Sequence, residues 1–238
     1  MSTVYAQQPT VLATVAHELR NPLSALQAAS ELLDRDFEIL EVAQRRALIA
    51  ELRRRVLSLR GLTDNLLSAA AIHDGHLSVA LRPLDVRIVI EESVALLRPI
   101  VDRKEQRVRT RVGRLPFVAA DERRLSQVLT NLITNASKYA GSGTDIDVTA
   151  SVASCGDVRV AVSDRGPGVA RDVIQRLFTP YERAGRTDGD GFGIGLSVVR
   201  SIIDAHHGRV GVKNRRGGGA TFWFGIPAIS AQLAGTHS

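Results

Sequence analysis

The 238-residue chain lacks the features that would place it outside the cell or in a membrane. Its one cysteine, Cys155, cannot form an internal disulfide, which favours a reducing compartment. No apolar run reaches about 18 residues, the length that predicts a transmembrane helix. Residues 1–10 lack the charged and apolar regions of a signal peptide. These absences predict a soluble, cytoplasmic protein.

Aromatic residues make up only 4% of the chain, so its cores must consist mainly of Leu, Val, Ile and Ala. The formal net charge is +6, and the arginines are spread along the chain rather than grouped in a tail. This charge favours an anionic ligand or an acidic protein surface. DNA binding has only the charge in its favour, because no basic run is interleaved with aromatic residues. We therefore expect no nucleic-acid partner.

Residues 9–34 carry apolar side chains three and four positions apart, as an amphipathic helix does. Pro22 lies within this pattern and removes one helix hydrogen bond, so we expect a bend just after His17. Alternatively, Pro22 starts a new helix that Asn21 caps. The continuous apolar stripe on both sides of Pro22 favours the bent helix.

Residues 38–72 show a second helical pattern, and the short connection at residues 34–37 makes the two helices antiparallel neighbours. Two helices alone cannot bury a wide apolar stripe on each. A four-helix bundle with a second copy would bury both stripes, so we predict a homodimer through residues 9–72. Residues 73–86 contain Gly and Pro, which predicts a linker that ends in a short strand.

The remaining chain mixes helices with hairpin-linked strands. This predicts an α+β protein in which a two-layer α/β sandwich follows the antiparallel helical hairpin. The expected helices are residues 86–102, 121–140 and 193–206, and the expected strands are residues 106–112, 144–153, 157–163, 209–214 and 219–226. The predicted domains are residues 1–75 for the hairpin and 76–228 for the sandwich, with a tail at 229–238.

His17 is followed by Glu18 on the first predicted helix. A neutral imidazole can attack phosphorus when a carboxylate orients the ring and takes the proton from its other nitrogen. Alone, such a pair is more often a solvent-facing feature of an amphipathic helix. Its interpretation therefore depends on the other motifs of the chain.

Asn131, Asn135 and Lys138 project from one face of the helix predicted at 121–140, since residues three and four apart are neighbours. An amide oxygen is a suitable ligand for Mg²⁺, and a lysine can meet a phosphate as a point charge. The alternative is an ordinary amphipathic helix with its polar residues outward.

The string DRGPG at 164–168 follows a strand, and GFGIG at 191–195 opens a helix. An acid at a strand end beside glycines can accept a hydrogen bond from an adenine amino group. Glycines before a helix let backbone N–H groups face phosphates. Singly, these strings fit a plain turn and a flexible loop. Together with HELRNP at 17–22 and NLITNASKY at 131–139, they predict an ATP pocket and a histidine that receives a phosphate.

In this order and spacing, the motifs resemble those of bacterial sensor histidine kinases of two-component systems, over about residues 10–227. The matching strings are HELRNPLSAL (H-box), NLITNASKYA (N-box), DRGPGV (G1 box), LFTPYERA (similar to the F-box) and GFGIGLSVVR (G2 box). The resemblance implies a dimerisation and histidine-phosphotransfer domain, then a catalytic ATP-binding domain of the Bergerat fold. It implies phosphorylation of His17 from ATP with Mg²⁺ and transfer to an aspartate of a response regulator, with dephosphorylation of that regulator as a further activity.

By this resemblance, His17 is the phospho-acceptor and Glu18 the general base. Asn21 matches the position that orients water when such proteins dephosphorylate their partner. Only 16 residues precede His17, so the chain is either a compact kinase or a part of a larger protein with a sensor. No receiver domain follows, so we expect the target aspartate on another protein.

The same resemblance makes Asn135 the Mg²⁺ ligand. It places Asn131, Lys138 and Tyr139 along the nucleotide site and makes Asp164 the adenine-binding acid.

Gly166 and Gly168 shape the turn after Asp164 in this pattern. Gly191, Gly193 and Gly195 match the hinge of the ATP lid and the phosphate-facing loop.

Phe178 and Tyr181 match the F-box, where a second Phe is more usual. Arg183 follows them as a residue that reaches the phosphates or the other domain.

Three other classes compete with this interpretation. A degenerate member would bind nucleotide but act only as a phosphatase or scaffold, and the intact His17, Glu18, Asn135 and Asp164 argue against it. Another Bergerat ATPase, such as a type II topoisomerase, mismatch-repair or chaperone domain, lacks a histidine-bearing hairpin before the pocket. A serine-directed anti-sigma kinase lacks that hairpin too.

Overall fold

The computed structural model describes residues 8–179 and 193–229. At His17 it describes the helix backbone but not the side chain. Across the described ranges, none of the helices combines the length and the apolarity that a bilayer crossing requires.

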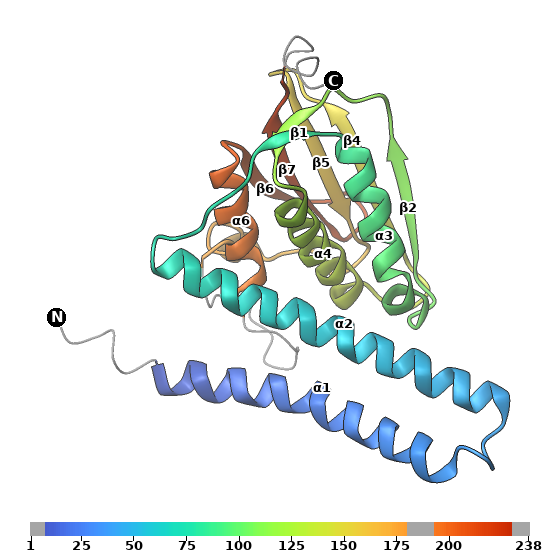
Figure 1. The fold of residues 1–238 in the computed structure, drawn as a ribbon. Helices are drawn as coiled ribbons and strands as arrows, with labels where there is room; N and C mark the ends of the chain where they lie inside the picture. The colour runs from blue at the N-terminus through green and yellow to red at the C-terminus, as the bar shows by residue number, and fades with distance from the viewer. Residues whose placement is uncertain (1–7, 180–192, 230–238) are drawn as a thin grey trace, which may run out of the picture.

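Two long helices form the predicted antiparallel hairpin, α1 (Gln8–Asp36) and α2 (Val42–His73). They lie side by side in Figure 1, with the turn at one end of the molecule. Pro22 lies inside α1, so the continuous helix is confirmed and the alternative start at Pro22 is excluded.

The second helix begins at Val42, four residues later than the pattern predicts. Glu41 is its N-cap, and the backbone N–H of Glu41 donates to Oε1 of Gln44 at 2.9 Å. This reciprocal capping box satisfies backbone groups at the helix start and so ends the turn there.

A mixed sheet and its covering helices make up the rest of the described chain. The five-stranded sheet has the order β2-β4-β5-β7-β6, in which β2 and β4 are parallel and all other neighbours antiparallel. A separate antiparallel pair joins β1 to β3. The elements are β1 (Arg82–Leu84), α3 (Val86–Asp102), β2 (Arg107–Val112), β3 (Val118–Ala120), α4 (Glu122–Tyr139), β4 (Asp145–Val152), β5 (Asp157–Ser163), α5 (Arg171–Ile174), α6 (Gly195–Ala205), β6 (Arg209–Asn214) and β7 (Ala220–Pro227).

Helices α3, α4 and α6 cover one face of the sheet (Figure 1). Strand residues alternate accordingly, since successive side chains point to opposite faces. In β5, Val158, Val160 and Val162 are buried against the helices, whereas Arg159 between them stacks on the Trp223 ring of β7 at 3.8 Å on the other face. This arrangement confirms the predicted α+β class and the two-layer sandwich.

Helix α2 also contacts α3, α4 and α6 of the sandwich. Figure 1 shows α2 passing along the ends of these helices, with α1 on its far side. The hairpin therefore contributes one wall to any cleft at the ends of α4 and α6.

Candidate functional site

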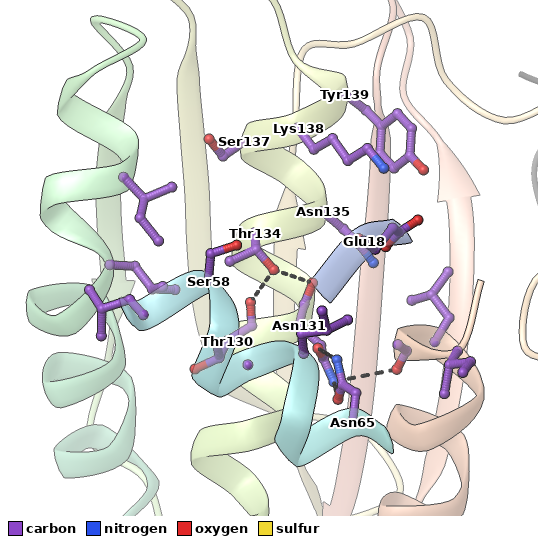
Figure 2. A pocket seen from close by; sticks show the side chains of 18 of the residues that line it. Glu18, Ser58, Asn65, Thr130, Asn131, Thr134, Asn135, Ser137, Lys138 and Tyr139 are labelled. Carbon is purple, nitrogen blue, oxygen red and sulfur yellow. Dashed lines mark hydrogen bonds between the residues drawn. The ribbon is translucent and has the colours of Figure 1, made fainter. Parts of the chain in front are cut away.

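A cleft of about 1130 Å³ lies between the hairpin and the sandwich. Its walls come from α1, α2, α4, the start of α6 and the turn after β5. The structure brings together there the predicted site residues Glu18, Asn21, Asn131, Asn135, Lys138, Tyr139, Asp164, Gly168, Gly193 and Gly195. Figure 2 shows Glu18 of α1 opposite the polar face of α4.

Helix α4 presents the predicted polar face to this cleft (Figure 2). Its start is fixed by Asp121, whose Oδ1 accepts from the backbone N–H of Arg124 at 3.1 Å. Asn135 is half-buried, and no hydrogen bond joins its amide to another described residue. The Lys138 ammonium lies 5.2 Å from the centre of the Tyr139 ring. Helix α4 therefore presents an amide oxygen and a cation to the cleft.

Asp164 is buried at the end of β5. Its Oδ1 accepts from the backbone N–H groups of Gly166 at 2.8 Å and Ala220 at 3.2 Å. No hydrogen bond from a described residue reaches its Oδ2, and the residue lines the cleft. One carboxylate oxygen thus anchors the side chain, and the other can accept a hydrogen bond from a ligand.

Gly166 does not line the cleft, but it allows the turn after Asp164 to pack closely against the end of α4. A Cβ at Gly166 would lie 2.7 Å from the carbonyl oxygen of Tyr139, closer than real contacts allow. Glycine is therefore required where this turn meets the end of α4.

Gly219, which none of the sequence motifs includes, packs on the same turn. Its φ is +90°, and a Cβ there would overlap the backbone carbonyl oxygen of Asp164. The available signal was the run of three glycines at 217–219 before the last strand.

His17, the acceptor that the sequence predicts, lies on α1. Glu18 and Asn21 of the same helix both line the cleft, Glu18 half-buried and Asn21 exposed. The backbone of His17 belongs to this segment of α1.

The predicted lid is described only in part. Gly193 lines the cleft, and Gly195 begins α6. Phe178 is half-buried against the core. Tyr181, Arg183 and Gly191 lie outside the described residues.

Helix α2 adds polar residues that sequence reasoning did not single out. Arg54 and Arg55 line the cleft, and Nε of Arg55 lies 2.6 Å from Oε1 of Glu51. Burial opposes ionisation of Glu51, but hydrogen bonds from both arginines lower the pKa of its carboxyl. Asn65 of α2 exchanges two hydrogen bonds with Asn131. The only advance signal was the clustering of Arg and polar residues in an otherwise apolar helix.

The donor set fits a nucleotide with a magnesium ion. Mg²⁺ usually takes one or two protein oxygens and completes its shell with water and phosphate oxygens. The open amide of Asn135 can supply one such oxygen, whereas the described residues contain no group of three His, Cys, Asp or Glu side chains that could hold a metal alone. The open Oδ2 of Asp164 suits an amino group such as that of adenine.

Two family models match the chain. The His Kinase A (phospho-acceptor) domain matches residues 7–75, and the histidine kinase-, DNA gyrase B-, and HSP90-like ATPase family matches residues 120–230. The adaptive-response sensory kinase SasA of Thermosynechococcus vestitus is 34% identical over 227 residues, which cover 92% of this chain and 60% of SasA.

Solved structures share the fold. Full-length ShkA in complex with AMPPNP has a TM-score of 0.64 and 33% identity, covering 94% of this chain and 46% of ShkA. The histidine kinase ThkA in complex with the response regulator protein TrrA has a TM-score of 0.59 and 24% identity, covering 94% of this chain and 63% of ThkA.

The chain belongs to the sensor histidine kinases of two-component systems, with a phospho-acceptor domain followed by an ATP-binding domain. It spans 60% of the length of SasA and less than half of ShkA.

Proposed function

We propose that this chain transfers the γ-phosphoryl group of ATP to His17 and passes it on to an aspartate of a response regulator. The observation that carries the proposal is a single cleft lined both by Glu18, the neighbour of His17, and by Asn135 and Asp164. A nucleotide bound there would have its phosphates beside the helix that carries the acceptor.

The nucleotide would be oriented from both ends of the cleft. Oδ2 of Asp164 accepts a hydrogen bond from the adenine amino group, while Lys138 attracts the phosphates. Asn135 supplies an oxygen to Mg²⁺, which offsets the negative charge of the transferring phosphoryl group when bound. Asn131 and Tyr139 complete the wall, and Gly193 and Gly195 bring the backbone at the start of α6 towards the phosphates.

The transfer forms a bond between an imidazole nitrogen of His17 and the γ-phosphorus. The bond to the bridging oxygen breaks, and ADP leaves with its electron pair. The proton on the other imidazole nitrogen passes to the carboxylate of Glu18, which acts as the general base. When the protein dephosphorylates the regulator, Asn21 orients the water that attacks the regulator's phosphoaspartate.

The active unit is a homodimer through the hairpin. Val42, Ile49 and Val56 lie seven residues apart on α2 and are 59%, 49% and 53% exposed in one copy. A repeat of seven is the spacing that buries a stripe between paired helices. A second hairpin would cover this stripe and complete a four-helix bundle.

The regulator docks on this bundle beside His17, in the cytoplasm. ThkA, which shares the fold, was crystallised with a response regulator protein. The phosphotransfer domain would span residues 1–75 and the catalytic domain residues 76–228, with a tail at 229–238. The end of α2 at His73 supports this division.

Incubation with γ-labelled ATP and Mg²⁺ tests the proposal in wild type, His17→Gln and Asn135→Ala. We expect acid-labile, base-stable label on wild type only. Cys155→Ser is the matched control, because Cys155 is exposed on the hairpin between β4 and β5, outside the cleft. Label that survives in His17→Gln, or no label on a folded wild type that binds ATP, would overturn the proposal.

A further inference from the structure

Asn65 of α2 and Asn131 of α4 face each other across the wall of the cleft (Figure 2). Nδ2 of Asn65 donates to Oδ1 of Asn131 at 2.8 Å, and Nδ2 of Asn131 donates to Oδ1 of Asn65 at 2.9 Å. Asn131 is 7% exposed, so little water competes for these bonds. The two residues form a reciprocal amide pair between the hairpin and the nucleotide-binding helix.

Neighbouring polar contacts hold Asn65 in this position. Nε2 of Gln127, one turn before Asn131, donates to Oδ1 of Asn65 at 3.2 Å and to Oγ of Ser68 at 3.0 Å. Nη1 of Arg124 donates to the same hydroxyl at 3.0 Å, and Ser68 is buried. The pair therefore belongs to a partly buried polar network between α2 and α4, in which each bond supports the others.

The amide nitrogen of Asn131 has no hydrogen left for a ligand. An amide carries two N–H groups. One points to Oδ1 of Asn65, and the other to the carbonyl oxygen of Gly195 at 3.4 Å. One turn further along α4, Asn135 lines the same cleft with no hydrogen bond to a described residue. Asn131 and Asn135 lie on one helix face but differ in their availability to a ligand. They differ because Asn65 of α2 is bonded to Asn131.

We propose that Asn65 is a positioning residue that competes with the nucleotide for Asn131 and holds the ATP-binding domain against α2. This inference rests on the proposed function, because it concerns the same nucleotide site. When the phosphates enter, the amide of Asn131 must exchange Asn65 for the ligand. Breaking the pair removes two of the hydrogen bonds between α2 and α4, so nucleotide binding and weaker docking of the domain on α2 are coupled. Reciprocity requires that docking on α2 weakens nucleotide binding by the same factor.

Titration of the full chain with ADP and Mg²⁺ tests the inference without phosphotransfer. Without the pair, Asn131 has unmet hydrogen bonds until the nucleotide arrives, so Asn65→Ala should bind ADP about 3- to 10-fold more tightly than wild type, as expected for the loss of a competing interaction of this size. Asn65→Leu keeps the side-chain volume and should give the same gain. A role confined to stability would lower the melting temperature and leave the affinity unchanged.

Thr63→Ala is the matched control on α2. Its hydroxyl donates only to carbonyls of its own helix, Leu59 and Arg60, so the affinity should stay at the wild-type value. Gln127→Ala removes one support of the pair and should give a smaller gain, which keeps the test decisive if Asn65 variants fold poorly.

Equal or weaker ADP binding in folded Asn65→Ala and Gln127→Ala would overturn the inference. Autophosphorylation of wild type is measured on the same preparation. Absence of label in a wild type that binds ADP would overturn the proposed phosphotransfer, whereas the ratio of ADP affinities still decides the role of Asn65.

Discussion

The backbone N–H of Asp121 donates to Nε2 of His206 at 3.0 Å, which joins the start of α4 to the end of α6. Nδ1 of the same ring lies 2.7 Å from the carbonyl oxygen of Ile202. These partners fix a neutral ring with its proton on Nδ1, because Nε2 must accept. His206 is 2% exposed, so this bond ties together the two helices that carry the nucleotide motifs.

Stability should fall in mildly acidic solution because of this histidine. Burial lowers the pKa of His206 in the folded chain, so below about pH 6.5 the unfolded chain binds a proton that the folded chain does not. The free energy of unfolding should therefore be at its full value above about pH 6.5 and decrease as the pH falls towards the folded pKa, with a slope of up to about 1.4 kcal/mol per pH unit. Urea unfolding between pH 5 and 8 measures this pH dependence of the free energy of unfolding.

His206→Gln should flatten that slope. The control is His207→Asn, since His207 is exposed and has a φ of 56°, which asparagine tolerates. Equal slopes in wild type and His206→Gln would show that this ring does not carry the pH dependence. Asp121 does not act in the same window: burial would raise the pKa of its carboxyl, but backbone N–H groups of Ala80 and Arg124 lower it overall.

Asp164→Asn separates base recognition from folding. An asparagine can still accept from Gly166 and Ala220, as Oδ1 of Asp164 does at 2.8 and 3.2 Å, so the fold should persist. In place of Oδ2, the asparagine would present an N–H group to the adenine amino group. Both groups are donors, so no hydrogen bond could form between them. We expect ADP affinity to fall by about 10- to 100-fold with an unchanged melting temperature, measured by calorimetry. Wild-type affinity in this variant would refute the assigned role.

Gly219→Ala should destabilise the catalytic domain through a steric clash. Its Cβ would overlap the carbonyl oxygen of Asp164, and its φ of +90° strains any side chain. Gly217→Ala is the matched control, because its φ is +84° but nothing lies within 4 Å of the added Cβ. We expect a loss of about 1 kcal/mol for Gly217→Ala and at least about 2 kcal/mol more for Gly219→Ala. Similar urea midpoints would contradict the clash.

Ile49→Glu should break the dimer. A charge in the exposed apolar stripe of α2 would be buried without a partner between two hairpins. Ala47→Glu introduces the same charge about half a turn away on an exposed position and should leave the dimer intact. Sedimentation equilibrium distinguishes the two, and a monomeric wild type would exclude this interface.

Pro22→Ala should change the balance of kinase and phosphatase activities. Pro22 lies five residues after His17 inside α1, where it removes a backbone hydrogen bond and weakens the helix locally. Alanine would stiffen this segment of the bundle. Unchanged rates of autophosphorylation and regulator dephosphorylation would show that the proline plays no part in switching.

Periodicity made most of the fold predictable. The helix expected at residues 86–102 is α3, and the strand expected at 157–163 is β5, because long periodic segments decide their own structure. Strand β3 and helix α5 were missed, since three or four residues are too few to show a period. Strand β3 depends on tertiary pairing with β1.

The motifs likewise indicated which residues would meet in the cleft, but not their bonding. No local pattern reveals the partner of Asn65, because Asn131 lies 66 residues away. The glycine run at 217–219 does not show which of its members must be glycine, since the requirement at Gly219 arises from the carbonyl of Asp164, just after β5. Contacts of this kind become visible only when the chain is folded.

The anchoring of Asp164 by two backbone N–H groups has a thermodynamic consequence. The carboxylate is preorganised by the turn after β5 and the start of β7, so its rotamer entropy is lost during folding rather than on ligand binding. If Asp164 binds the adenine as proposed, we expect selectivity for the base to be a fixed property of the ATP-binding domain, independent of the position of the hairpin. A nucleoside without phosphates should report that selectivity in isolation, and any dependence of affinity on the hairpin should appear only when phosphates are attached.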